Sequence, residues 1–268
     1  MRQHAATSVQ PGGSATSASE GAAPPACPVC QSPGTHYLMA VAGYGYWRCP
    51  HCQARFMDPH QRPDRQAEYE RYCEHDNRVD DPRYRRFLAK LADPLLERLA
   101  PRRRGLDYGC GPGPALAAML EEAGHEVALY DPFFYPDPAP LSRRYDFITC
   151  TETAEHFHRP AAELERLDAL LRPGGILAIM TCFQTDDDHF AGWHYRRDPT
   201  HVVFYRAATL HTLAGRFGWS CEIPVKDIAL MHKPEGGPGP PPLGAGGAAT
   251  PARGARTTPG RKVDHDER

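Results

Sequence analysis

A glycine-rich turn near the middle of the chain constrains the fold more than any other feature. Residues 105–115 read Gly-Leu-Asp-Tyr-Gly-Cys-Gly-Pro-Gly-Pro-Ala. The pattern predicts a short buried strand that ends in an acid, Asp107, followed by a tight turn and the start of a helix. Gly109, Gly111 and Gly113 have no Cβ, so the backbone of this turn can approach a ligand closely.

The turn differs from the dinucleotide-binding fingerprint. Counted from Gly109, G-x-G-x-x-G requires a glycine where Pro114 stands; counted from Gly111, it requires one where Leu116 stands. An acid two residues before the first glycine suits a cationic ligand better than a pyrophosphate. Asp107 followed by G-x-G-x-G resembles the first motif of class I S-adenosylmethionine (SAM) dependent methyltransferases. The resemblance implies a SAM site formed by Asp107, Gly109, Gly111 and Gly113.

The next strand supplies a second acid. Residues 126–131 form a predicted strand that ends at Asp131, where a carboxylate can accept both ribose hydroxyls. The alternative is a turn residue, because Pro132 follows. Only about a dozen residues precede the next strand, too few for a crossover helix and a further strand. The third strand of the family is therefore expected to be missing, and the loop offers Phe133 and Phe134 as adenine contacts.

The remaining pattern predicts an α/β, Rossmann-like class I methyltransferase sheet that ends in an antiparallel hairpin at residues 219–232. After the strand 145–150 the sequence Glu-Thr-Ala-Glu-His resembles a segment of many small-molecule methyltransferases. This resemblance implies that Glu152 and His156 lie beside the methyl group, while the alternative is that Glu155 and His156 cap a turn.

Residues 184–205 have no clean period, so they are interpreted as a substrate-facing lid. His194, Asp198 and His201 are its candidate acid–base or orienting groups, which makes His156, Glu152, His194 and His201 the catalytic candidates. The acids and histidine at 186–189 are interpreted as a solvated run and not as a second metal site.

Four cysteines near the N-terminus form two C-x-x-C hooks separated by 18 residues: Cys27, Cys30, Cys49 and Cys52. This spacing is typical of a structural zinc site, and four protein ligands leave no open position for catalysis. A redox pair, or His51 as a ligand, is the less favoured alternative. The ribbon is interpreted as a cap or pocket wall, and a nucleic-acid or partner contact is the alternative.

These features divide the chain into five segments: a disordered tail (1–26), a zinc ribbon (27–62), a helical lead-in (63–104), the methyltransferase domain (105–233) and a disordered Gly/Pro-rich tail (234–268). The net charge of −2 does not favour a nucleic-acid binder. Reduced cysteines, no apolar leader and no long apolar run predict a cytoplasmic protein.

Three functional hypotheses follow. The favoured one is a SAM-dependent methyltransferase with a structural Zn²⁺ and a small-molecule acceptor. The second is an RNA methyltransferase that reads its substrate through the ribbon, with the basic stretch 83–104 as its best support. The third is a non-catalytic SAM- and zinc-binding interaction protein. The acceptor atom and the oligomeric state are not predicted.

Overall fold

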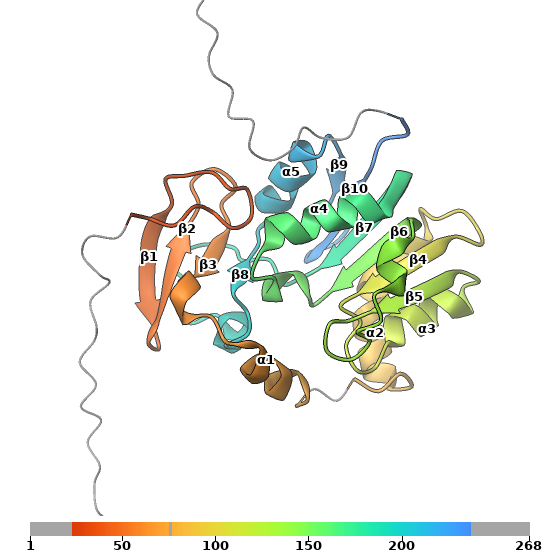
Figure 1. The fold of residues 1–268 in the computed structure, drawn as a ribbon, viewed down its shortest axis with the longest axis horizontal. Coiled ribbons are helices and arrows are strands. Elements are labelled where there is room, and N and C mark those ends of the chain that lie inside the picture. The colour runs from red at the N-terminus through yellow and green to blue at the C-terminus, as the bar shows by residue number, and fades with distance from the viewer. Residues whose placement is uncertain (1–22, 75–76, 237–268) are drawn as a thin grey trace, which may run out of the picture. The chain divides into compact units, whose positions relative to one another are not determined.

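A six-stranded mixed sheet lies at the centre of the computed structural model, which describes residues 23–74 and 77–236 (Figure 1). Its strand order is β5-β4-β6-β7-β10-β9. The strands β5, β4, β6 and β7 are parallel, and β10 runs antiparallel to both of its neighbours. Their bounds are β4 (Arg104–Tyr108), β5 (Glu126–Tyr130), β6 (Tyr145–Thr151), β7 (Leu171–Met180), β9 (Ser220–Glu222) and β10 (Ile228–His232).

The sheet has its edge at β5. After β5 the chain passes through the short 3₁₀ helix η2 (Ala139–Ser142) and enters β6, which pairs with the other side of β4. Between these two strands the only β-structure of the described residues is an isolated bridge, from Asp131 to Tyr135. The predicted Rossmann-like sheet, with a terminal antiparallel hairpin and no third strand, is confirmed.

Helices cover both faces of the sheet. Side chains along a strand alternate between the two faces, so each face can pack against its own layer of helices. On β7, Ile176, Ala178 and Met180 pack with α2 (Pro82–Leu96) and α3 (Ala115–Glu122). The alternate residues of β7 pack in the cluster that includes α4 (Pro160–Leu170) and α5 (Ala207–Arg216). The domain is therefore a three-layer α/β/α arrangement, with α1 (Arg65–Tyr72) before α2.

A second, antiparallel sheet carries the N-terminal hooks. It consists of β1 (His36–Val41), β2 (Tyr44–Arg48), β3 (Arg55–Met57) and β8 (Val203–Phe204), in that order. Because β8 comes from the far end of the predicted lid, the ribbon and the lid share one sheet (Figure 1). Among the described residues, no helix is long and apolar enough to span a bilayer.

Candidate active site

A cavity of about 740 Å³ lies at the carboxyl ends of β4, β5 and β6. Its volume falls in the upper part of the range of about 300–1,000 Å³ that is common for small-molecule sites. Helices α1 and α2 contribute to its wall through Tyr72 and Tyr84. Eight of the nine residues predicted for cofactor binding or catalysis line it: Asp107, Gly109, Gly111, Gly113, Asp131, Glu152, His156 and His201.

The glycine turn needs its glycines for two different reasons. Gly109 has φ of +77°, a left-handed conformation that disfavours side chains. Gly113 is restricted by packing, because a Cβ there would lie 1.5 Å from the backbone oxygen of Asn77. Asn77 also lines the cavity, so the turn and this loop close one side of the site together.

Asp107 is the buried acid of this turn. Its side chain is 3% exposed and accepts a hydrogen bond of 2.7 Å from the Thr149 hydroxyl. Burial raises the pKa of Asp107 to about 6, and the nearby Asp131 adds to the rise. A carboxylate that has lost its hydration and gained only one hydrogen bond is a favourable place for a cation.

Asp131 holds two parts of the site together. One carboxylate oxygen accepts the backbone N–H of Gly111 at 3.0 Å, and the other accepts those of Phe133 and Phe134 at 2.8 and 3.0 Å. The side chain therefore acts as a turn residue, which was the alternative interpretation, and it also lines the cavity. The ribose contact stays a prediction.

An aromatic wall stands beside Asp131. The ring of Phe133 contacts Tyr72 at 5.3 Å and lies 4.4 Å from the Arg65 guanidinium, while Tyr69 lies 5.9 Å from Phe134. Phe133 and Phe134 line the cavity, as their predicted role against adenine requires.

Glu152 follows β6 in a strained conformation, with φ of +48°. Burial, and then the negative charge of Glu155, raise the pKa of Glu152 to about 9. The carboxyl group is therefore protonated at neutral pH, when it can donate a hydrogen bond but cannot act as a base. Its Oε2 lies 3.3 Å from the Tyr195 hydroxyl oxygen.

Glu155, His156 and His201 converge at the inner end of the cavity. Their ligand atoms lie within 4.8 Å of one another, and the two imidazole rings are 4.7 Å apart. Burial lowers the pKa of His156, so its imidazole is neutral at pH 7. Tyr195 donates its hydroxyl hydrogen to Glu155, which is fully buried.

The segment that carries His201 is held by ion pairs on both sides. Burial would raise the pKa of Asp198, but hydrogen bonds from Arg71 and Thr200 lower it well below its usual range. Asp187 pairs with Arg48 and with the fully buried Arg55 of the ribbon. These contacts fix the predicted lid against α1 and β3.

His194 lies outside this constellation. It is exposed and does not line the cavity, although the next residue, Tyr195, reaches Glu155. Sequence reasoning assigned no role to Tyr195. The sequence offered only one signal for such a role: Tyr195 carries a hydroxyl and lies between two polar residues, in a segment without a clear hydrophobic period.

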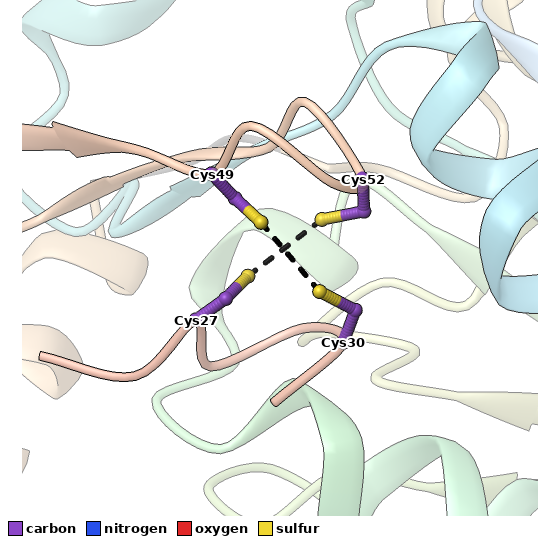
Figure 2. Close-up of side chains that lie close together, drawn as sticks. All are labelled: Cys27, Cys30, Cys49 and Cys52. Atoms are coloured by element: carbon purple, nitrogen blue, oxygen red, sulfur yellow. Dashed lines mark hydrogen bonds between the residues drawn. The ribbon is translucent and has the colours of Figure 1, made fainter. Parts of the chain in front are cut away.

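The four N-terminal cysteines converge as predicted, and Figure 2 shows their sulfurs facing a common centre. The Sγ atoms of Cys27 and Cys52 are 3.6 Å apart, as are those of Cys30 and Cys49. A disulfide requires about 2.05 Å. Zn–S bonds of about 2.3 Å in a tetrahedron place sulfurs about 3.8 Å apart, so this set fits Zn²⁺.

Comparison with protein families identifies the domain. Residues 81–222 match the family model described as a methyltransferase domain, which is more than half of the chain. The chain belongs to this methyltransferase family. The match begins at the N-cap of α2 and ends in β9, so it includes every strand of the central sheet except β10.

Several solved structures of methyltransferases match the chain at low identity. A 1,6-didemethyltoxoflavin N1-methyltransferase from Burkholderia thailandensis shares 20% identity, with 75% of this chain and 99% of that chain covered and a TM-score of 0.43. A magnesium protoporphyrin IX methyltransferase from Synechocystis shares 15%, covering 63% and 94%, with a TM-score of 0.44.

A further structural match is an O-methyltransferase family protein from Burkholderia thailandensis, at 15% identity and a TM-score of 0.43. It covers 65% of this chain, which spans 64% of that protein. No protein with a curated function matches the chain in sequence.

Proposed function

We propose that this protein transfers a methyl group from SAM to a small-molecule acceptor. The observation that carries the proposal is one cavity that joins a buried, poorly compensated carboxylate, Asp107, to a cluster of polar side chains around His156. The first suits a cationic donor, and the second suits an acceptor that must lose a proton.

The donor end would be formed by the glycine turn with Asp107 and Asp131. SAM supplies an activated methyl group on a sulfonium, so the protein chiefly has to align the two substrates and exclude water. Asp107 offers a negative charge to the ammonium group. The backbone of Gly109 to Gly113 lies close to the cavity, and Phe133 and Phe134 offer rings to the adenine.

The acceptor end would be formed by Glu152, His156 and His201. Neutral His156 is able to accept a proton from an acceptor hydroxyl, a contribution on the order of 10²–10⁴ in rate. Protonated Glu152 is able to donate a hydrogen bond to the acceptor. His194 has no part in this proposal because it is exposed and lies away from the cavity.

A small molecule is favoured over RNA as the acceptor. Three of the seven arginines in the stretch that supported the RNA hypothesis are paired with acids: Arg85 with Glu122, Arg98 with Glu222, and Arg104 with Glu126. These pairs reduce the positive charge that the stretch can offer to phosphates. We also propose that the four cysteines bind a structural Zn²⁺ and that the protein works in the reducing cytoplasm.

The test combines binding and turnover. SAM affinity is measured by calorimetry for the wild type and for Asp107→Ala, with circular dichroism to show that both are folded. Labelled SAM is then incubated with protein and cell extract, and the label is separated into RNA, protein and small molecules. Unchanged SAM affinity in Asp107→Ala would overturn the donor site. Label in RNA, with binding that weakens steeply with salt, would favour the second hypothesis.

A further inference from the structure

We propose that Glu155, His156 and His201 form a second metal site, which binds a divalent first-row transition-metal ion at the inner end of the cavity. Metal binding here does not depend on methyl transfer. Two imidazoles and one carboxylate are a common ligand set for Zn²⁺ and Fe²⁺ sites that keep open positions. Among the described residues, only this set and the four cysteines bring three or more such ligands together.

Both imidazoles have the kind of backbone partner that metal-binding histidines usually have. Nδ1 of His156 lies 3.0 Å from the carbonyl oxygen of Thr200, and Nδ1 of His201 lies 2.6 Å from that of Tyr195. A carbonyl only accepts hydrogen bonds, so each Nδ1 must carry the proton. In the neutral form of each ring, the lone pair is then on Nε2. Backbone acceptors that fix the tautomer in this way are typical partners of metal-binding histidines.

Glu155 supplies the independent observation. Its side chain is 0% exposed, and only one of its oxygens is used, by the Tyr195 hydroxyl. The other oxygen, Oε2, has no hydrogen-bond partner among the described residues. A buried carboxylate oxygen without a partner is costly, and a cation bound by the Glu155 carboxylate would offset this cost.

The geometry needs only a small adjustment. Nε2 of His156 lies 3.9 Å from Oε1 of Glu155, and the three ligand atoms are within 4.8 Å of one another. An ion with bonds of about 2.0–2.2 Å requires separations of roughly 3.0–3.5 Å. Side-chain rotations that move the ligand atoms by roughly one ångström would bring them to these separations. No further protein ligand is needed, since a catalytic site keeps positions open.

The site has a consequence for the acceptor, which rests on the proposed function. All three ligands line the cavity, so the open positions of the ion would face the acceptor. An ion at this place favours an acceptor that binds through oxygen, because it makes a bound hydroxyl more acidic. The hydroxyl proton would leave to solvent, the C–S bond of the donor would break, and a C–O bond would form. With the ion bound, the acidified hydroxyl would replace the base role that His156 has in the metal-free site.

The experiment counts metal ions in the full-length protein. The chelated protein is reloaded with Zn²⁺ or Co²⁺ under reducing conditions and desalted, and the metal content per chain is measured by mass spectrometry. We expect two ions per chain in the wild type and one in His201→Ala and in Glu155→Gln. The Co²⁺ form should show a strong thiolate charge-transfer band from the four-cysteine site, and this band should persist in both variants.

Three controls separate the outcomes. His211→Ala removes an exposed histidine of α5 and should keep two ions. Cys30→Ser should lose the thiolate band, which assigns that band to the four-cysteine site. Asp107→Ala should lose SAM affinity and keep both ions, so the metal proposal and the methyltransferase proposal fail separately. A wild type that binds one ion, or a His201→Ala variant that still binds two, would overturn the second site.

Discussion

The two ends of the cavity are constructed in different ways. The donor end comes mainly from one continuous stretch, the strand, turn and helix around Asp107, which lies between its sheet neighbours β5, followed by Asp131, and β6, which carries Thr149. The acceptor end joins Glu155 and His156, which follow β6, to His201, which is 45 positions further along the chain. A local turn can be recognised from its letters, whereas a convergence of distant segments depends on how the sheets pair.

The ribbon is what holds the acceptor end in place. Val202 accepts the backbone N–H of Met57 in β3 and donates its own to the carbonyl of Glu155, both at 2.9 Å. Its neighbour His201 is one of the cavity residues. On the side of the hooks, the carbonyl of Pro28 accepts the N–H of Ala161 in α4. The four-cysteine hooks are therefore expected to stabilise one end of the cavity more than the other.

The largest effect should come from Cys49→Ser, which removes one thiolate from the hooks. Structural zinc contributes about 10–16 kcal/mol of apparent binding energy in zinc-finger peptides, so loss of tight binding should unfold the ribbon. We expect hydrogen exchange to increase strongly at residues 195–204 and only weakly at 105–115.

Two controls sharpen this comparison. Cys73→Ser changes an exposed cysteine after α1 and should leave both segments protected. The chelated wild type should reproduce the Cys49→Ser pattern. If exchange increased equally at both ends of the cavity, the ribbon would stabilise the whole domain and not the acceptor end.

The second effect concerns the donor end. Asp107→Asn keeps the volume and the bond to Thr149 but removes the buried charge. A pKa of about 6, against an ordinary 3.8, means that burial costs the ionised form about 3 kcal/mol. The variant should therefore unfold at a higher temperature than the ligand-free wild type, by scanning calorimetry, while losing SAM affinity.

The same carboxyl group predicts two opposite pH dependences in the wild type. The folded chain keeps the Asp107 proton up to about pH 6, and the unfolded chain loses it near 3.8. Folding therefore takes up a proton between these values, so this group's contribution to the free energy of unfolding increases as pH falls through the window. SAM affinity should decrease over the same window, because the protonated acid has no charge to offer. SAM affinity that does not change between pH 7 and 5 would show that Asp107 does not hold the cation.

A third effect tests the close approach of the turn to its loop. Gly113→Ala places a Cβ against the backbone oxygen of Asn77, so the loop must move, at a cost of about 1–3 kcal/mol. We expect SAM affinity to drop about tenfold or more, measured by calorimetry.

Gly215→Ala is the matched control for this substitution. Gly215 lies in α5 with nothing within 4 Å of the added Cβ. Alanine there should stabilise the protein by up to about 1 kcal/mol and leave SAM affinity unchanged. Equal SAM affinity in both variants would mean that the loop can yield without affecting the donor site.

The donor end and the sheet could be predicted because their signals are local. The strand lengths, the short 132–144 connection and the Gly-rich turn each lie within a few residues of one another. The acceptor end was predicted only in part. His156 and Glu152 follow a recognised strand, but the position of His201 depends on the pairing of β3 with β8, and residues 203–204 and 55–56 are about 150 positions apart. The same limit applies to residues 194 and 195, because the sequence does not show that Tyr195 contacts Glu155 while His194 is exposed.

The smallest effect should come from Tyr195→Phe, which separates positioning from binding. Tyr195 does not line the cavity, but its hydroxyl donates to Glu155. Loss of a hydrogen bond to a charged group costs about 1.5–3 kcal/mol. The substitution removes only the hydroxyl, so the ring still packs against His201, with 4.1 Å between the ring centroids. SAM affinity should stay within about twofold, because the donor end shares no contact with this hydroxyl. Transfer of labelled methyl should slow, and the second metal ion should bind about 10–100-fold more weakly, as expected when a partner of a metal ligand is removed. If SAM affinity decreased as much as transfer, the two ends of the cavity would not be independent, and the division on which these predictions rest would be wrong.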